Sequence, residues 1–175
     1  MTWAILTLCV VVVIIAAVIL RSRKLDNLNR AVARSRRVLE NALNERAHQA
    51  LAASSSGKLD IAGAMILADA ATNVLDTTMH PLVNDGLDYV SMGAHDPADR
   101  LARESELSRA LRLTVDELES PIDPLEKARE RVRMARMFHN SRVSRARRVR
   151  GSLLVRMFRL YGTAPVPATV DLDDE

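Results

Sequence analysis

Residues 128–150 read ARERVRMARMFHNSRVSRARRVR and hold eight arginines between Arg131 and Arg150, with no acidic residue after Glu130. Such a run is compatible with a nucleic-acid-binding tract, a membrane-surface helix or the solvated face of a bundle helix. Apolar residues recur through it at three- and four-residue steps, the spacing of one face of an α-helix. The spacing therefore first predicts a helix that packs into a bundle. The predicted buried stripe is Leu125, Ala128, Val132, Ala135, Phe138 or His139, Val143, Ala146, Val149, Leu153 and Met157.

The chain on either side of this stretch predicts three further long helices. Apolar stripes at helical spacing occupy residues 25–51, 61–75 and 101–118, and the Arg-rich helix is expected to run from 123 to about 160. The segments SSSGK, HPLVNDGLDYVSMGAHDP and SPIDP are rich in Gly, Pro, Ser and Asp and separate these helices. The stripe of the second helix consists of Ile61, Met65, Ala68, Thr72 and Leu75.

The composition also favours helices. Of the 175 residues, 48% are hydrophobic but only 3% are aromatic, and Ala, Leu and Arg, which suit helices, are frequent. No stretch outside the N-terminal run alternates apolar and polar residues as a half-buried strand would. The only cysteine, Cys9, lies in that apolar run and excludes a disulfide framework. The predicted fold class is all-α: an N-terminal transmembrane helix followed by an antiparallel, up-down bundle of about four long helices.

Residues 3–20, WAILTLCVVVVIIAAVIL, contain no charged residue. A helix of this length spans roughly 27 Å, close to the hydrocarbon thickness of a bilayer. A cleaved signal peptide would instead have a basic segment before a shorter apolar run. Here the basic residues follow the run, as Arg21, Arg23 and Lys24. The positive-inside rule then predicts an uncleaved single-pass anchor in a cell membrane, with its N-terminus outside and a cytoplasmic C-terminal domain.

These observations predict an anchor with its basic flank at 1–24, a cytoplasmic bundle at 25–160 and an extended acidic tail at 161–175. In an up-down bundle, the end of the fourth helix returns toward the membrane. The basic residues near this end are then candidates for contact with anionic lipid or with a partner. They are Arg142, Arg145, Arg147, Arg148, Arg150 and Arg156.

Three interpretations of the arginines remain open at this stage. They can cover a solvated face and pair in part with acidic residues of the second and third helices, they can also hold the bundle against an anionic leaflet, or they can bind nucleic acid. Single-strand binders usually interleave stacking aromatic residues with basic ones, and only Phe138, Phe158 and Tyr161 lie near this stretch. The sequence therefore argues against nucleic acid as the partner.

No residue pattern indicates catalysis. The chain contains no glycine-rich phosphate loop, nucleophile elbow or HExxH motif, so we expect no enzyme, no catalytic residues and no cofactor. Histidine ligand spacing is also missing, and no metal is expected. His139 is expected to be a packed helix residue. The one arrangement that resembles a metal site combines His80 and His95 with Asp85, Asp88 or Asp96.

Several stretches resemble the LemA family. RAVARSRRVLENALNERAHQAL follows the apolar run directly, and ESELSRALRLTVDEL is similar to the family's third helix. KARERVRMARMFHNSRVSRARRVR resembles the final-helix signature, R-x3-AR-x-(F/Y)-(Y/H)-N, and LYGTAPVPATVDLDD resembles the acidic tails of actinobacterial members. HQALAASSSGKLD departs from the family's usual DLIPNLV stretch. The signature positions are Arg131 or Arg129, Ala135, Arg136, Phe138, His139 and Asn140.

The resemblance implies a membrane-anchored antiparallel bundle and no agreed enzymatic activity. The leading functional hypothesis is therefore a scaffold or protein-interaction module anchored in a bacterial inner membrane, with membrane lipid and other proteins as partners. A homo-oligomer formed through the long first helix stays open. The alternative is a peripheral sensor whose Arg-rich helix binds anionic lipid.

Overall fold

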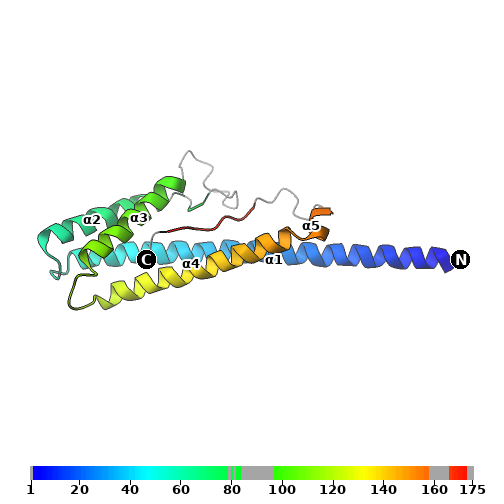
Figure 1. Cartoon of the computed structure of the whole chain (residues 1–175), viewed down its shortest axis with the longest axis horizontal. Coiled ribbons are helices and arrows are strands. Elements are labelled where there is room, and N and C mark those ends of the chain that lie inside the picture. The colour runs from blue at the N-terminus through cyan, green and yellow to red at the C-terminus, as the bar shows by residue number, and fades with distance from the viewer. Residues whose placement is uncertain (1, 79, 81, 84–96, 158–165, 173–175) are drawn as a thin grey trace.

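The computed structural model describes residues 2–78, 80, 82–83, 97–157 and 166–172. The molecule is elongated, and helices from later in the chain lie against one long N-terminal helix (Figure 1). No strand occurs among these residues, which confirms the all-α prediction. The helices are α1 (Thr2–Ser54), α2 (Ile61–Asp76), α3 (Pro97–Thr114), α4 (Asp123–Arg150) and the short α5 (Leu153–Met157).

The helix α1 is unbroken for 53 residues because neither proline nor glycine interrupts it. Its N-terminal part projects from the rest of the molecule, and the side chains of residues 2–17 are all exposed (Figure 1). Among the described residues, α1 is the one helix long and apolar enough to cross a membrane, although a signal sequence would meet the same criterion. The predicted end within SSSGK is confirmed: α1 stops at Ser54, and Gly57 has a φ of 73°.

The helix α4 lies along α1 in the opposite direction. Near the far end of the molecule, Leu125 packs in one cluster with Ala47 and Ala50. At the other end of the contact, Val143 packs in one cluster with Val32. The antiparallel prediction is therefore correct, and so is most of the predicted α4 stripe. The buried α4 residues are Leu125, Ala128, Val132, Ala135, His139, Val143 and Ala146.

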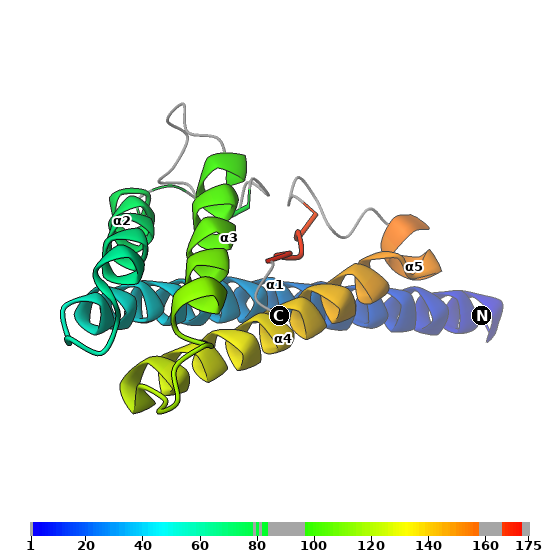
Figure 2. The ribbon, with the colours of Figure 1, turned by 60° about the vertical axis from the view of Figure 1, so that its left-hand side comes forward.

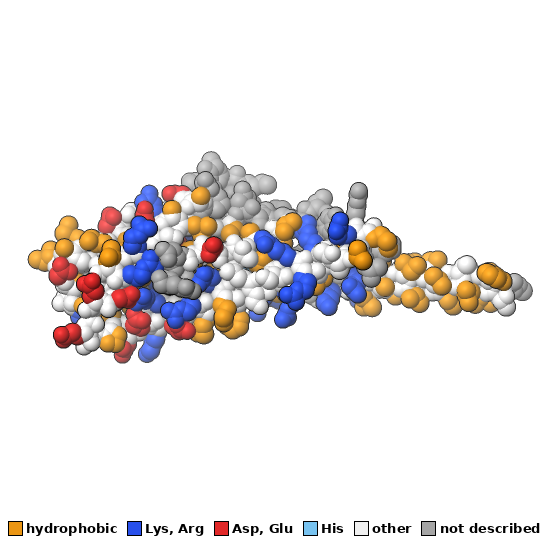
Figure 3. Space-filling model, in the orientation of Figure 1, with side chains coloured by type: hydrophobic (Ala, Val, Ile, Leu, Met, Phe, Trp, Pro, Cys, Tyr) orange, Lys and Arg blue, Asp and Glu red, His pale blue; other side chains and the backbone are white. Residues whose placement is uncertain are grey.

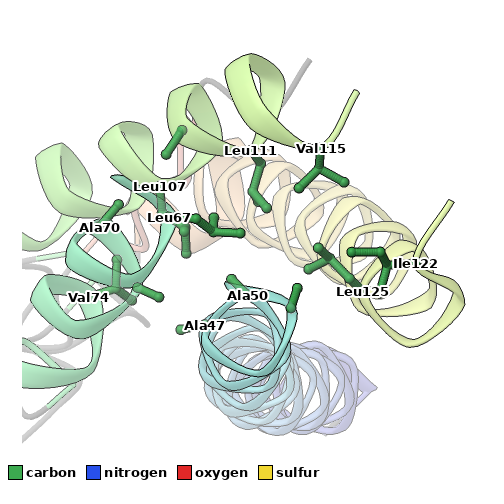
Figure 4. Packing of buried hydrophobic residues seen from close by; sticks show 13 residues of the cluster. Ala47, Ala50, Leu67, Ala70, Val74, Leu107, Leu111, Val115, Ile122 and Leu125 are labelled. Atoms are coloured by element: carbon green, nitrogen blue, oxygen red, sulfur yellow. The ribbon is translucent and has the colours of Figure 1, made fainter. Parts of the chain in front are cut away.

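The helices α2 and α3 cover the far end of α1 (Figure 2). Viewed along α1, their apolar side chains converge on Ala47 and Ala50 and on the start of α4 (Figure 4). Small residues permit this close approach: a Cβ added at Gly63 would lie 3.3 Å from Cγ2 of Thr114 on α3. The buried members contributed by α2 and α3 are Leu67, Ala70, Ala71, Val74, Leu107, Ala110 and Leu111.

The stripe predicted for α2 was wrong. Ile61 and Met65, which were expected in the core, are 83% and 69% exposed. The helix buries another face instead, through Gly63, Leu67, Ala70, Ala71 and Val74. Because α2 is apolar on more than one face, its spacing fits two stripes, and the smaller residues were the ones that allowed close packing.

The predicted continuation of α4 to about residue 160 was also wrong. The helix ends at Arg150, and Gly151, which has a low helix propensity, forms its C-cap. The chain then turns into α5, where Leu153 and Met157 are exposed rather than buried as the stripe predicted. Phe138 is exposed as well, so His139 is the member of that pair in the core.

Residues 166–172 contain no helix or strand, and they lie back along the bundle (Figure 2). Val170 and Leu172 are buried in a cluster with residues of α1 and α4. The sequence predicted an extended tail but not this contact.

Candidate functional site

The structure brings two predicted groups of basic residues to the same end of the bundle. The contact of Val143 and Ala146 with Val32 fixes the register between α4 and α1. Four further residues of α4 advance about 6 Å, so the end of α4 lies level with about residue 25 of α1. We define the basic surface as Arg142, Arg145, Arg147, Arg148, Arg150 and Arg156, together with Arg21, Arg23 and Lys24 of the flank.

The side chains of the basic surface point mostly into solvent. All of them are exposed except Arg150, which is half-buried. Two also bind backbone: Arg142 donates to the carbonyl of Ala31 at 3.2 Å, and Arg147 donates from Nε to the carbonyl of Pro167 at 2.8 Å. Figure 3 shows Lys and Arg side chains gathered where the apolar helix leaves the bundle, whereas acidic side chains gather at the far end.

The other arginines of α4 behave differently. Arg129 forms ion pairs with Asp116 and Glu126, and Arg133 forms one with Glu130. The hydrogen bond to Asp116 raises the pKa of Arg129. In the part of the chain that the structure describes, no ion pair involves Arg145 or Arg148. Pairing with acidic residues therefore accounts for Arg129 and Arg133 near the start of α4 and not for Arg145 and Arg148 near its end.

The basic surface lies where it can contact an anionic layer at the end of the apolar segment of α1. By rise per residue, Arg145, Arg148 and Arg150 lie about 8–15 Å along α1 beyond Leu20, the last residue of the uncharged apolar run. Electrostatic attraction persists over about 8 Å at physiological ionic strength, and an arginine side chain adds several ångströms of reach. These residues could therefore contact phosphate groups at that depth without any change in the fold.

A buried ion pair between α1 and α3 escaped the sequence analysis. Nη2 of Arg46 lies 2.9 Å from Oε2 of Glu104, and their side chains are 2% and 0% exposed. Nη1 of Arg46 donates to Oγ of Ser108 at 3.1 Å, and that hydroxyl donates to the carbonyl of Glu104. A signal was present, because Arg46 occupies a stripe position three residues after Leu43.

A second buried arginine connects α3 with the segment after α2. Arg100 donates to the carbonyls of Thr78 at 3.0 Å and of His80 at 2.6 Å. Burial lowers the pKa of Arg100, while the charges of Glu104 and Glu40 oppose that shift. These bonds satisfy two carbonyls in the segment that follows α2, and they connect that segment to α3.

A buried histidine of α4, His139, contacts Ser35 of α1. Oγ of Ser35 lies 3.2 Å from Nδ1 of His139, but it donates its proton to the carbonyl of Val32 at 2.8 Å. Because that proton is used on the carbonyl, the hydroxyl is available to accept from Nδ1–H of His139, and the hydrogen bond joins α1 to α4. His139 is buried as predicted.

Among the residues described, no group of three metal-ligating side chains occurs. Nδ1 of His80 lies 3.7 Å from a carboxylate oxygen of Asp99. The remaining residues of the weak metal-site arrangement, His95 with Asp85, Asp88 and Asp96, fall outside the described residues.

Comparisons with known proteins add no assignment. No protein-family model, curated protein or solved structure matches the chain. The resemblance to the LemA family therefore stays a prediction that rests on the residues quoted above.

Proposed function

We propose that this chain is a single-pass membrane protein whose cytoplasmic helical bundle is held on an anionic leaflet by the basic surface and serves as a scaffold for other proteins. The observation that carries the proposal is the antiparallel register of α4 on α1, with Val143 beside Val32. This register returns the arginines at the end of α4, among them the exposed Arg145 and Arg148, toward the end of the apolar segment. The LemA-like resemblance is consistent with such a bundle.

The charge distribution supports an orientation in the membrane. Basic residues follow the apolar segment directly, which favours a cytoplasmic bundle. Each basic residue near an anionic leaflet contributes about 1 kcal/mol. Several such contacts, together with the membrane-spanning segment of α1, would fix the orientation of the bundle relative to the membrane surface.

The far end of the bundle supports the scaffold role. Ile61, Met65 and Ile66 of α2 and Leu113 of α3 are all more than half exposed. Of these, Ile66 and Leu113 line a surface groove of about 440 Å³ between α2 and α3, together with charged residues such as Asp69 and Glu106. Exposed apolar patches with polar rims are typical of protein-binding surfaces. The sensor alternative would use the basic surface alone, without a protein partner at this end.

Vesicle flotation of the chain lacking residues 1–20 tests the lipid contact, because almost all of those residues are exposed and none is in the core. We expect binding to vesicles with about 30% anionic lipid and none to neutral vesicles. R145Q/R148Q/R156Q should weaken binding by about 30- to 150-fold, since about 2–3 kcal/mol of attraction is lost.

The matched control is R109Q/K127Q/R131Q, which removes the same charge from exposed positions on α3 and the first half of α4. It should weaken binding by less than about threefold, because those positions lie beyond the screening length. Equal losses of vesicle binding in both variants, or equal binding to neutral and anionic vesicles, would contradict a specific contact between the basic surface and anionic lipid. A protein partner captured by full-length chain and lost with I61D/M65D would favour the scaffold over the sensor.

A further inference from the structure

The segment 166–172 is bound to α4 chiefly through its backbone. The carboxamide of Asn140 makes two hydrogen bonds to one residue: Nδ2 donates to the carbonyl of Val170 at 2.9 Å, and Oδ1 accepts from its N–H at 3.0 Å. A neighbouring β-strand would satisfy an extended chain in the same paired way. Asn140 therefore binds the backbone of the extended segment at this position, and neither hydrogen bond depends on which side chain the bound residue carries.

Two arginines on the same helix bind the segment on either side of Val170. Arg147 donates from Nε to the carbonyl of Pro167 at 2.8 Å, and Arg136 donates from Nη1 to the carbonyl of Leu172 at 3.4 Å. Three side chains of α4, at positions 136, 140 and 147, thus follow an extended chain that runs antiparallel to the helix. Such a row of backbone contacts is the usual basis of affinity in peptide-binding grooves.

Apolar side chains of the segment are buried against the bundle. Val170 and Leu172 are buried, whereas Thr169 and Asp171 between and before them are exposed. This in-and-out alternation is that of an extended peptide lying on a surface. The two apolar side chains enter a cluster formed mainly by α1 and α4, and Pro167 is buried as well. The cluster includes Leu39, Ala42, Leu43, Leu82, Val83, Val132 and Ala135.

We propose that this surface of α1 and α4 is a peptide-binding site, and that residues 166–172 are its resident occupant and can be displaced. The partner is an extended protein segment with a proline followed by two apolar residues two positions apart, the pattern of Pro167, Val170 and Leu172. The site is independent of the basic surface's proposed contact with lipid, because it needs no membrane.

The occupant is suited to exchange. Val32 and Val143 pack α1 against α4 at one end and Ala50 and Leu125 do so at the other, in clusters that do not include the segment. Release of residues 166–172 therefore leaves the helix pair joined. A covalently attached occupant has an effective concentration of about millimolar, so a competing segment binds once that advantage is overcome or removed.

Fluorescence anisotropy of a labelled peptide spanning residues 163–175 tests the proposal on the full chain in detergent. V170D/L172D should release the resident segment and allow the peptide to bind, at least tenfold tighter than to the unaltered chain. Adding N140A should weaken this binding at least tenfold, because both backbone hydrogen bonds are lost. S141A, at the exposed neighbouring position of α4, is the control and should leave binding unchanged.

A second measurement covers the case in which V170D/L172D disturbs folding. A spin label at T169C, an exposed position, with Cys9 replaced by Ala, should be restricted in the full chain and gain mobility as unlabelled peptide is added. A peptide carrying aspartate at the positions of Val170 and Leu172 should not release the label. Three results would overturn the proposal. The peptide could fail to bind V170D/L172D although that variant keeps its helix content, or it could bind equally well after N140A is added. The third is a spin label at position 169 whose mobility does not change with excess peptide.

Discussion

Replacing Glu104 by alanine is expected to lower the free energy of unfolding by about 3–5 kcal/mol, because it leaves the Arg46 guanidinium buried without its counter-charge. Arg46 is 2% exposed and cannot reach water without a change in the packing of α1 against α3. Urea unfolding followed by circular dichroism, on the chain lacking residues 1–20, measures the effect. At this size the loss is a large part of the total stability.

Glu106→Ala provides the control on the same helix. The side chain of Glu106 is 50% exposed and pairs with Arg103, so its loss should cost less than about 1 kcal/mol. The double variant R46M/E104L should recover most of the stability lost in E104A, since an apolar pair of similar volume needs no counter-charge. If E104A cost no more than E106A, the buried ion pair would not be a determinant of the α1–α3 contact.

Leu43→Ala is expected to lower the free energy of unfolding by about 2–5 kcal/mol, from the lost burial and from the cavity that remains. Leu43 is fully buried in the cluster shared by α1, α4 and residues 166–172. Val38→Ala on the same helix removes a side chain that is mostly exposed and should cost less than about 1 kcal/mol. Equal losses measured by urea unfolding would show that this part of α1 does not face the core.

The sequence predicted the parts of the fold that depend on long, regular patterns. The stripes of α1 and α4 each run over many turns and have one apolar face, so their spacing identified Leu39, Leu43, Val132 and Val143 as core residues. Three loops that join four helices then implied an antiparallel arrangement. The location of the basic surface follows from these two facts alone.

The sequence pattern did not predict the buried face of a helix where two apolar stripes have equally regular spacing. The helix α2 offers one stripe with Ile61 and Met65 and another with Leu67 and Val74, and only the shape of its neighbours selects between them. Gly63 and the alanines on the second stripe permit close approach to α3. The packing energy gained from this approach depends on α3, so the sequence of α2 alone does not indicate it. The same reasoning applies to the C-terminal end of α4, where a single glycine outweighed a continuing apolar period.

Long-range partners of polar residues could not be predicted. Arg46 and Glu104 are 58 positions apart, and Asn140 and Val170 are 30 apart. Charged residues within an apolar stripe do signal a buried pair, and Arg46 was such a signal, but the stripe does not identify the partner. Asn140 lies beside the stripe of α4, and nothing local distinguishes it from a solvated residue.

The central claim, that α4 returns the basic surface to an anionic leaflet, is tested most directly by depth-dependent quenching in the full chain. Environment-sensitive labels are attached at R148C and R131C, two exposed positions of α4 that differ by about 25 Å along the helix, with Cys9 replaced by Ala. The chain is placed in lipid nanodiscs that contain anionic lipid and a quencher on the lipid headgroup. We expect strong quenching at position 148 and little at 131, with the difference reduced in neutral lipid. Equal quenching at the two positions, or stronger quenching at 131, would contradict the account.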